Sequence, residues 1–265
     1  MSGQNPLKNV KITVVIPTYN EAENLPRLVS ALFALPLQEL TVLVVDDNSP
    51  DGTGRIANEL AANSGGRLEV LHRPGKQGLG TAYISGFRKA LDSGAEAIGQ
   101  MDADFSHPPE KLVPLAAALQ SCAVALGSRY VPGGSVDERW PVWRKGLSAF
   151  GNLYARLILR MPVKDATGGF RLWRRETLQA MPLERVRSNG YAFQVEMTYI
   201  AHRLGYRFCE IPIYFADRRW GQSKMSFRIQ REAAIRVWQM LWEYRGLRPP
   251  AGAPESVQRS PIKHK

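Results

Sequence analysis

Two aspartates stand close enough in the sequence to bind one cation together. Asp102 and Asp104 directly follow the end of the apolar, strand-like segment 97–101. In an extended segment, side chains two residues apart point the same way, so both carboxylates can face one ion. Mg²⁺ and Mn²⁺ prefer oxygen ligands and keep room for water and for a substrate phosphate. An Asp-x-Asp sequence alone is more often a solvated turn, and its position at a strand end is what favours a metal site.

A second acidic pair, Asp46 and Asp47, ends the apolar segment 40–45. An aspartate at the strand edge of an α/β fold can accept hydrogen bonds from a base or a ribose. The alternative is a cap on the next helix, which Ser49 or Asp51 could also provide. Both can hold, because two adjacent aspartates can have different partners.

A glycine-rich loop and several cations are candidate phosphate ligands. Residues 75–82 resemble a phosphate cradle that opens a helix, although the spacing matches neither the P-loop nor the dinucleotide fingerprint. A plain helix-start loop is the alternative. Arg129, Arg144 and the run 217–224 supply Arg forks, which bind phosphate bidentately, and Lys point charges. A solvated basic face is the alternative for these cations.

The composition indicates an anionic partner. The chain of 265 residues has 35 Lys and Arg against 24 Asp and Glu, a net charge of +11. Such a surplus suits nucleic acid, anionic lipid or a phosphorylated substrate. Cys122 and Cys209 lie far apart without neighbouring His or Cys, which predicts two inert thiols in a reducing compartment. We see no signal peptide, and the longest apolar stretch, 112–126, is too short to span a bilayer, so we expect a soluble or membrane-peripheral protein.

The elements that position these side chains alternate between strand and helix in the first half. Apolar, β-branched runs predict strands at 11–17, 40–45, 68–71 and 97–101. We expect Asn20 to cap the first helix, with Glu23 completing a capping box. Repeated strand–helix units imply an α/β fold with a mostly parallel sheet and helices on both faces. Ligands bind such sheets at the carboxyl ends of the strands, where the polar clusters lie.

The second half is less regular. We expect a loop at 129–145, an amphipathic helix at 146–159, a strand at 207–215 and a last helix at 229–244. A tail with several prolines follows, so we predict a globular domain over 1–245 and a disordered basic tail over 246–265.

The last helix is also amphipathic. Ile235, Trp238, Leu241 and Trp242 share one side, with arginines around them. Basic amphipathic helices with Trp lie in bilayer interfaces, and packing on the domain core is the alternative. Trp140 and Trp143, beside Arg139, Arg144 and Lys145, form a second candidate for an interfacial segment.

Seven motifs, in order, carry a family resemblance. They are Pro17–Glu21, Asp46–Thr53, Gly78–Tyr83, Asp102–His107, Gly127–Tyr130, Thr167–Arg171 and Asp217–Lys224. The sequence thereby resembles the dolichyl-phosphate (polyprenyl-phosphate) mannosyltransferases, inverting family 2 glycosyltransferases with a GT-A (Rossmann-like) fold. The resemblance covers residues 11–225, and the last motif points to the branch with phospholipid acceptors.

The resemblance implies roles for individual residues. The donor and its diphosphate are assigned to Pro17, Tyr19, Asn20, Glu21, Asp47, Asp102 and Ala103. The metal is assigned to Asp102, Asp104 and Ser106, where Ser106 replaces a glutamine of some relatives and leaves the metal preference open. The phosphates of donor and acceptor are assigned to Arg129, Arg144, Arg218 and Lys224. Among all of these, Asp104, Arg129, Arg218 and Lys224 are expected to be catalytic.

The implied reaction is transfer of mannose from GDP-mannose to a polyprenyl phosphate, with Mg²⁺ or Mn²⁺ as cofactor. The acceptor is already an anionic nucleophile, so no strong general base is needed, but cations must lie between two phosphates of like charge. Another donor such as UDP-glucose stays open, and so does a catalytically silent nucleotide-sugar-binding regulatory subunit, which the intact aspartate pair disfavours. Nucleic-acid binding is disfavoured because stacking aromatics do not interleave the arginines. We expect a peripheral enzyme on the cytoplasmic face of a membrane, possible partners being the bilayer and a membrane subunit.

Overall fold

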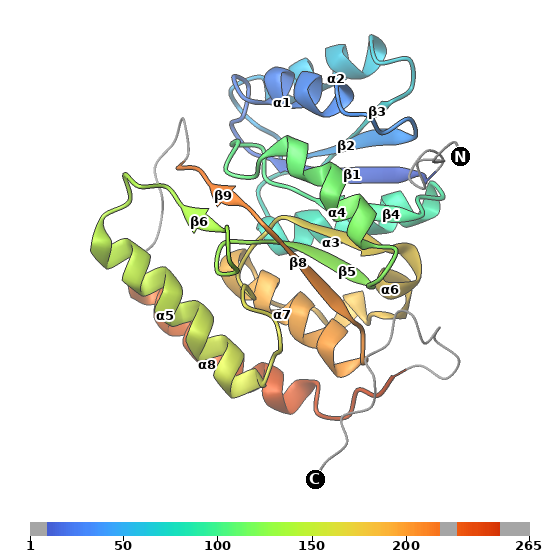
Figure 1. Ribbon diagram of the computed structural model, residues 1–265. Coiled ribbons are helices and arrows are strands. Elements are labelled where there is room, and N and C mark those ends of the chain that lie inside the picture. Colours follow the sequence, from blue (N-terminus) through green and yellow to red (C-terminus); the bar gives the residue numbers. More distant parts are fainter. Residues whose placement is uncertain (1–9, 218–226, 250–265) are drawn as a thin grey trace, which may run out of the picture.

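The computed structural model describes residues 10–217 and 227–249 of the chain (Figure 1). The first half alternates strands and helices as β1 (Ile12–Thr18), α1 (Leu25–Phe33), β2 (Leu40–Asp46), α2 (Thr53–Ala62), β3 (Leu68–His72), α3 (Leu79–Asp92) and β4 (Ala97–Gln100). The second half contains η1 (Pro109–Lys111), α4 (Leu112–Ala118), β5 (Val124–Ser128), β6 (Ser135–Val136), α5 (Val142–Leu159), β7 (Arg171–Arg174), α6 (Arg175–Ala180), η2 (Leu183–Arg185), α7 (Gly190–Arg203), β8 (Phe208–Pro212), β9 (Tyr214–Phe215) and α8 (Phe227–Glu243).

A seven-stranded sheet forms the centre of the molecule, in the order β3-β2-β1-β4-β7-β5-β8. Its neighbours run parallel except at β7, which is antiparallel to both β4 and β5. β6 and β9 form a separate parallel pair. The predicted α/β fold with a mostly parallel sheet is confirmed.

Alternating side chains of β1 pack into two hydrophobic clusters, one on each face of the sheet. Val14 and Ile16 pack in one cluster with residues of α1 and α4, whereas Val15 packs in a second cluster with residues of α3, α6 and α7. Both faces of the sheet are therefore covered by helices, as expected (Figure 1). Each fully buried aliphatic side chain of this kind contributes about 1.5–3 kcal/mol through removal from water.

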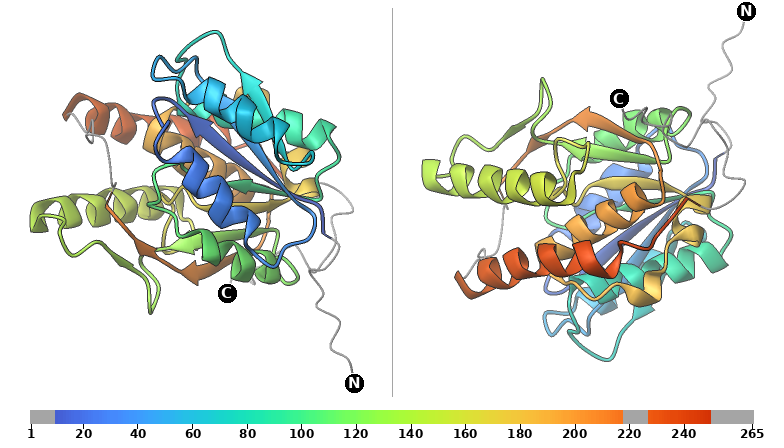
Figure 2. Two further views of the ribbon diagram at one scale, coloured as in Figure 1. Left: turned by 90° about the horizontal axis from the view of Figure 1, so that it is seen from above. Right: turned by 90° about the horizontal axis from the view of Figure 1, so that it is seen from below.

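α5 and α8 lie against each other and project together to one side of the sheet (Figure 2). α8 also packs on α7. None of the helices within residues 10–217 and 227–249 is long and apolar enough to cross a bilayer.

The first helix begins later than the expected cap at Asn20, so the predicted capping box with Glu23 is wrong. α1 starts at Leu25, after Asn24. Asn20 has a left-handed backbone, with φ 63°, and its N–H donates to the Ser49 hydroxyl at 3.1 Å. Asn20 thus closes a turn that ties the end of β1 to the loop after β2.

Other boundaries also differ from the expectations. α5 begins at Val142, inside the segment expected to be a loop, and follows Pro141, a residue well tolerated at a helix start. β5 and β7 were not expected. β7 is only four residues long and mixes arginine with Leu and Trp, so it has no clear apolar period. The strand expected at 207–215 is divided into β8 and β9 at Ile213.

The chain keeps contact with the core just beyond the predicted domain boundary after residue 245. Residues 246–249 are described, and Leu247 packs against the core. The remainder of the predicted tail, 250–265, lies outside the described residues, and its disorder stays a prediction.

The strand order reverses direction at β1. β1, β2 and β3 build outward in one direction, and the chain then returns to place β4 on the other side of β1. In open α/β sheets, ligands bind beyond the carboxyl ends of the strands at such a reversal. The segments that follow β1, β2 and β4 meet there, and they carry the predicted donor and metal residues.

Candidate active site

The loop after β4 holds the aspartate pair in a fixed turn. Asp104 is 5% exposed, and its Oδ1 accepts hydrogen bonds from the Ser106 N–H at 3.0 Å and the Ser106 hydroxyl at 2.6 Å. Phe105 between them has a left-handed backbone, with φ 60°. Such a conformation is costly for a residue other than glycine and persists only where its surroundings hold it. The turn is therefore built around the Asp104 carboxylate.

His107 fixes the same turn from beneath. Its Nδ1 accepts a hydrogen bond from the Asp102 N–H at 3.0 Å, and its ring stacks on Phe170 with centroids 5.3 Å apart. Burial lowers the pKa of His107, so the ring is neutral near pH 7, with its proton on Nε2. His107 therefore clamps the loop and does not act as a charged phosphate ligand.

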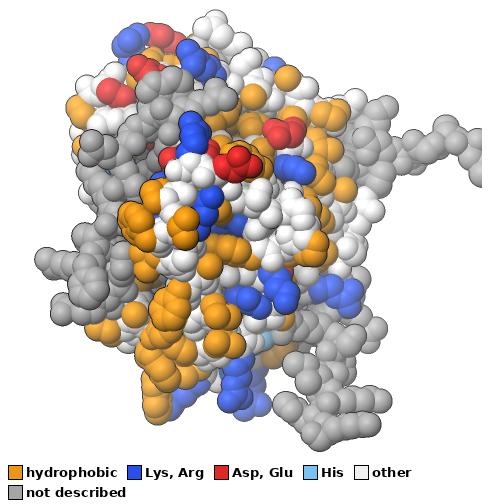
Figure 3. Space-filling model, turned by 60° about the vertical axis from the view of Figure 1, so that its left-hand side comes forward, with side chains coloured by type: hydrophobic (Ala, Val, Ile, Leu, Met, Phe, Trp, Pro, Cys, Tyr) orange, Lys and Arg blue, Asp and Glu red, His pale blue; other side chains and the backbone are white. Residues whose placement is uncertain are grey.

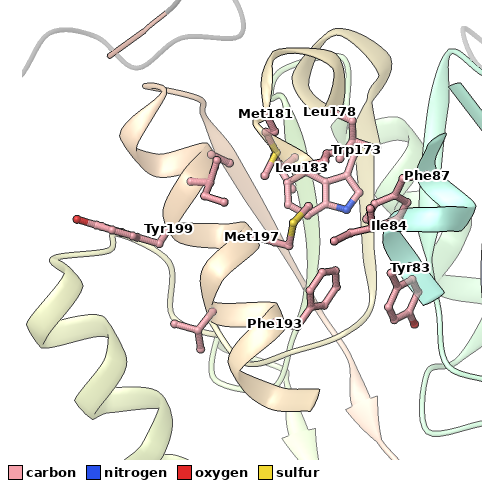
Figure 4. Close-up of a cluster of buried hydrophobic side chains, with 14 of the residues drawn as sticks. Tyr83, Ile84, Phe87, Trp173, Leu178, Met181, Leu183, Phe193, Met197 and Tyr199 are labelled. Atoms are coloured by element: carbon pink, nitrogen blue, oxygen red, sulfur yellow. The ribbon is translucent and has the colours of Figure 1, made fainter. Parts of the chain in front are cut away.

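Asp102 is oriented from another side by Tyr83 of α3. The Tyr83 hydroxyl donates to Asp102 Oδ1 at 2.7 Å. Its buried ring lies flat against Phe193 of α7, with centroids 5.7 Å apart and an interplanar angle of 2° (Figure 4). Burial, with the charge of Asp102, raises the pKa of Tyr83, so the phenol remains a donor at neutral pH. The sequence indicated Tyr83 only as the end of a motif.

The aspartate pair fits a divalent cation of the Mg²⁺ or Mn²⁺ type. Asp102 and Asp104 are oriented by Tyr83 and Ser106, so their carboxylates are held in place before a ligand arrives. Within the described part of the chain, no group of three or more His, Cys, Asp or Glu side chains could hold a metal. Hard cations commonly take one or two protein carboxylates and complete their shell with water and substrate phosphate. Metal binding by these two residues and by Ser106 stays a prediction.

The two aspartates at the end of β2, Asp46 and Asp47, have separate partners. Asp46 is buried and accepts hydrogen bonds from the hydroxyls of Thr18 at 3.0 Å and Ser49 at 2.6 Å. Asp47 forms an ion pair with Arg73, with 2.7 Å between Oδ1 and a guanidinium nitrogen. Burial raises the pKa of Asp47, and Arg73 opposes this shift. Asp46 is thus structural, and Asp47 lies with its cation at the predicted donor side.

The helix-cap alternative for this segment is wrong, because Gly52 is the N-cap of α2 and no side chain among the described residues caps that helix. Asp51 instead accepts hydrogen bonds on its Oδ1 from the N–H and the hydroxyl of Thr53, at 3.0 and 2.6 Å. Thr53 is the first residue of α2, so this contact orders the start of that helix. Asp46 and Asp47 are left for the roles described above.

The segment after β1 lies against the loop after β2. Tyr19 is 37% exposed, and the Lys76 ammonium lies 4.0 Å from its ring centroid. The Glu21 N–H donates to the Thr53 hydroxyl at 2.9 Å, and Pro17 is half-buried beside β2. An accessible aromatic ring at this place can stack on a base.

Arg129, predicted to bind phosphate, is held by a buried carboxylate. Its Nε and one terminal nitrogen donate to the two oxygens of Asp165, both at 2.7 Å. The same terminal nitrogen donates to Thr167. Burial alone would raise the pKa of Asp165, but the Arg129 guanidinium holds it below the ordinary value. The fork of Arg129 is thus occupied by the protein, which the sequence did not indicate because Asp165 lies 36 residues away.

Arg144 is placed beside the beginning of the basic run. Its guanidinium donates to Asp217 at 3.2 Å and lies 3.8 Å from the Trp140 ring centroid. Trp140 is buried and Trp143 is strongly exposed. Of the two tryptophans predicted to contact a membrane, only Trp143 is therefore accessible. The two remaining predicted cations, Arg218 and Lys224, lie outside the described residues.

Comparisons with known proteins show the family of the chain. The family model described as "Glycosyl transferase family 2" matches residues 13–181. An undecaprenyl-phosphate mannosyltransferase of Micrococcus luteus is 46% identical over 246 residues, covering 92% of this chain and 100% of the relative. A polyprenol monophosphomannose synthase of Mycolicibacterium smegmatis is 46% identical over 235 residues, covering 88% and 87%.

The fold is also found among solved structures. A glucosyl-3-phosphoglycerate synthase from Mycobacterium tuberculosis, in complex with Mn²⁺, UDP and glucosyl-3-phosphoglycerate, superposes with a TM-score of 0.60. It covers 92% of this chain and 82% of its own at 16% identity, which is evidence for a shared GT-A-like fold alone. The sheet, the family match and the two relatives lead to one conclusion: the chain belongs to glycosyl transferase family 2 and is a glycosyltransferase.

Proposed function

We propose that this enzyme transfers mannose from GDP-mannose to a polyprenyl phosphate, with inversion at the anomeric carbon. The observation that carries the proposal is the similarity to the two relatives, both named for mannosyl transfer to a polyprenyl carrier. That similarity extends well beyond the residues matched by the family model and covers nearly the whole chain. It therefore includes the half of the chain that carries Arg144 and Asp217.

The reaction asks for little acid–base chemistry from the protein. The acceptor phosphate is an anion at neutral pH, and one of its oxygens attacks the anomeric carbon. The new C–O bond forms as the C–O bond to the diphosphate breaks, and GDP leaves with the electron pair. The obstacle is electrostatic, because two phosphates approach each other around a cationic sugar. Positive charge between the two phosphates is what such a site must provide.

Arg144 and the residues after Asp217 are the cations we assign to the acceptor phosphate. Arg144 is partly exposed and is oriented by Asp217 and Trp140. Arg218 follows Asp217 directly in the sequence, and Lys224 completes the run. Because the fork of Arg129 is bound to Asp165, we assign Arg129 a contribution through its charge and through the order it gives to the segment around Thr167.

The donor lies, in this proposal, along the ends of β1, β2 and β4. Asp102 and Asp104 would hold Mg²⁺ or Mn²⁺, with Ser106 beside them, and Pro17, Tyr19, Asn20, Glu21, Asp47 and Ala103 would line the nucleotide sugar. The cation supplies charge neutralisation of the leaving diphosphate. Tyr83 and His107 keep the aspartate loop in position, as their hydrogen bonds to Asp102 indicate.

The lipid acceptor requires a membrane, and we place the contact on α5 and α8. Exposed apolar side chains on these helices include Val142, Trp143, Phe150, Leu157, Ile235, Trp238 and Trp242. Figure 3, which turns this side of the molecule forward, shows hydrophobic side chains gathered next to Lys and Arg. Apolar residues with Trp beside basic residues are typical of interfacial helices. A position on the cytoplasmic face, with or without a membrane subunit, belongs to the same proposal.

Two measurements separate this function from its alternatives. Calorimetry with Mn²⁺ should show tighter binding of GDP than of UDP, and NMR of the product should show a β-linked mannosyl phosphate from the α-linked donor. Tighter UDP binding would contradict the guanine donor and favour a UDP-sugar. Nucleotide-sugar binding without transfer to any polyprenyl phosphate would favour the silent subunit.

A further inference from the structure

A buried carboxylate joins three separate parts of the chain on the side of the sheet that carries α7 and α8. Glu196 of α7 is fully buried. Its Oε2 accepts the Ser188 N–H at 2.8 Å, and its Oε1 accepts Arg236 of α8 at 2.6 Å and the Tyr244 hydroxyl at 2.7 Å. A carboxylate in such surroundings is stable only while its cation and donors remain in place.

Arg236 extends this cluster to the segment 186–190. Its Nε donates to the Ser188 hydroxyl at 2.9 Å, while its terminal nitrogens donate to Glu196 and to Glu243. One planar guanidinium therefore fixes α7, α8 and Ser188 at the same time. A lysine ammonium has a different shape and cannot reproduce this fork.

The segment 186–190 presses directly on the glycine-rich loop that opens α3. A Cβ on Gly80 would collide with the Ser188 carbonyl oxygen, and one on Gly78 would lie 2.5 Å from Asn189 Oδ1. Gly78 also has φ +102°, which side chains rarely adopt. These glycines are thus required by a close approach of the segment 186–190, which the sequence alone interpreted as a phosphate cradle or a helix start.

The same loop leads to the aspartate pair. α3 begins at Leu79 and carries Tyr83, whose hydroxyl is bound to Asp102. Figure 4 shows Tyr83 beside Phe193, which stands in α7 one turn before Glu196. A shift of the segment 186–190 therefore changes the position of the helix start that orients Asp102.

We propose that Arg236 is a positioning residue of the donor site. By binding Glu196 and Ser188 together, it holds the segment 186–190 against Gly78 and Gly80, and so fixes the start of α3 and the Tyr83–Asp102 hydrogen bond. The inference rests on the proposed function for its kinetic test. Its structural half, the link from α8 to the glycine loop, can be measured without any substrate.

The test variant is Arg236→Lys, which keeps the charge beside Glu196 and loses the bond to Ser188. The matched control is Arg203→Lys. Arg203 of α7 also donates to the carbonyls of Arg245 and Leu247, just after α8, and no hydrogen bond joins it to the segment 186–190 among the described residues. Both variants remove arginine hydrogen bonds between α7 and the segment at or after α8, and only the first should affect the glycine loop.

The kinetic readout is the KM for GDP-mannose against the KM for polyprenyl phosphate. Couplings through packed networks of this kind amount to 0.5–2 kcal/mol, or about 2- to 30-fold. Arg236→Lys should raise the donor KM by about that factor and leave the acceptor KM within about twofold. Ser188→Ala should raise the donor KM as well. The donor KM of the double variant should not exceed that of Arg236→Lys, because the two residues share one contact.

Amide hydrogen exchange of residues 78–83 supplies the readout that needs no substrate. Exchange there should accelerate several-fold in Arg236→Lys and stay unchanged in Arg203→Lys. Loss of thermal stability in both variants, with unchanged exchange at 78–83, would overturn the inference and leave Arg236 a merely structural residue. Faster exchange in a protein whose wild type does not use GDP-mannose would support the link and contradict the proposed function instead.

Discussion

At the scale of single residues, the candidate site is built from side chains that hold other side chains. Ser106 binds Asp104, Tyr83 binds Asp102, and His107 binds the backbone between the strand and the pair. The strained φ of Phe105 is sustained by these contacts. A carboxylate held in this way needs little reorganisation when charge arrives, which is the general basis of electrostatic catalysis.

Replacement of the more buried aspartate should remove activity without unfolding the protein. We expect Asp104→Ala to lower the rate of transfer by about 10²- to 10³-fold or more, because the site loses a carboxylate that would hold the cation on the leaving diphosphate. Circular dichroism and thermal melting should be close to those of the wild type. Asp92→Ala, an exposed aspartate at the end of α3, is the control and should be fully active. Normal transfer by Asp104→Ala at ordinary metal concentration would contradict the role of this residue.

The buried pair of Arg129 and Asp165 should stabilise the protein at neutral pH and lose this contribution in acid. Removing one partner leaves a charge buried without compensation, so Asp165→Asn should lose about 3–5 kcal/mol in urea unfolding at pH 7. The pKa of Asp165 is below its ordinary value of 3.8 in the folded protein. The unfolded chain therefore takes up the proton first, and the contribution is full above pH 3.8 and lost as pH falls below it.

A series of unfolding measurements at different pH values can contradict this prediction. The difference in unfolding free energy between wild type and Asp165→Asn should shrink as the pH is lowered from 5 toward the acid limit of folding. A constant difference over that range would show that the ionised carboxylate is not the source of the stability.

At the scale of elements, α8 has two faces with different roles. Val237, Met240 and Tyr244 are buried against the core, whereas Ile235, Trp238 and Trp242 are more than half exposed. The packed and interfacial interpretations of this helix thus describe opposite sides of it. Leu241, expected among the exposed residues, is partly buried and packs against the core.

The exposed face should govern binding to vesicles. The double variant Trp238→Ser, Trp242→Ser should lose about tenfold or more in partition to vesicles with anionic lipid, since two large apolar side chains are lost from the interface. Transfer to a short-chain, water-soluble acceptor phosphate should remain within about twofold, which controls for folding. Unchanged flotation of the double variant would move the membrane contact elsewhere.

Some elements could be predicted from the sequence, and others could not, for physical reasons. β1, β2 and β4 are buried on both faces and are apolar in sequence, so the acidic pairs that follow β2 and β4 could be placed at one edge of a sheet. β7 is too short and too mixed for a periodic signal, although its place between β4 and β5 makes it central. The sequence could not show that Asn20 adopts a left-handed turn, because its hydrogen-bond partner Ser49 comes from another loop.

At the scale of the whole molecule, the contacts that complete the site join residues far apart in the chain. Arg129 with Asp165, Tyr83 with Phe193 and Arg236 with Glu196 are each made by folding and leave no local pattern. The two cysteines, which do not belong to the site, are also brought together only by folding. They are free, as expected, but Cys122 and Cys209 both approach the Ala118 carbonyl oxygen, at 3.1 and 3.8 Å. Motif spacing predicted which residues form the site. Only the fold reveals the residues that hold them in place.

The charge of the molecule, +11, suits an enzyme that meets two phosphates and an anionic surface. The most direct test of this account is transfer of radiolabelled mannose from GDP-mannose to a polyprenyl phosphate in vesicles, with Mg²⁺ or Mn²⁺ and with EDTA. We predict a mannosyl phospholipid that forms only with metal present and is absent with EDTA. No labelled lipid with either metal, from protein that is folded and bound to the vesicles, would contradict mannosyl transfer as the function of this chain.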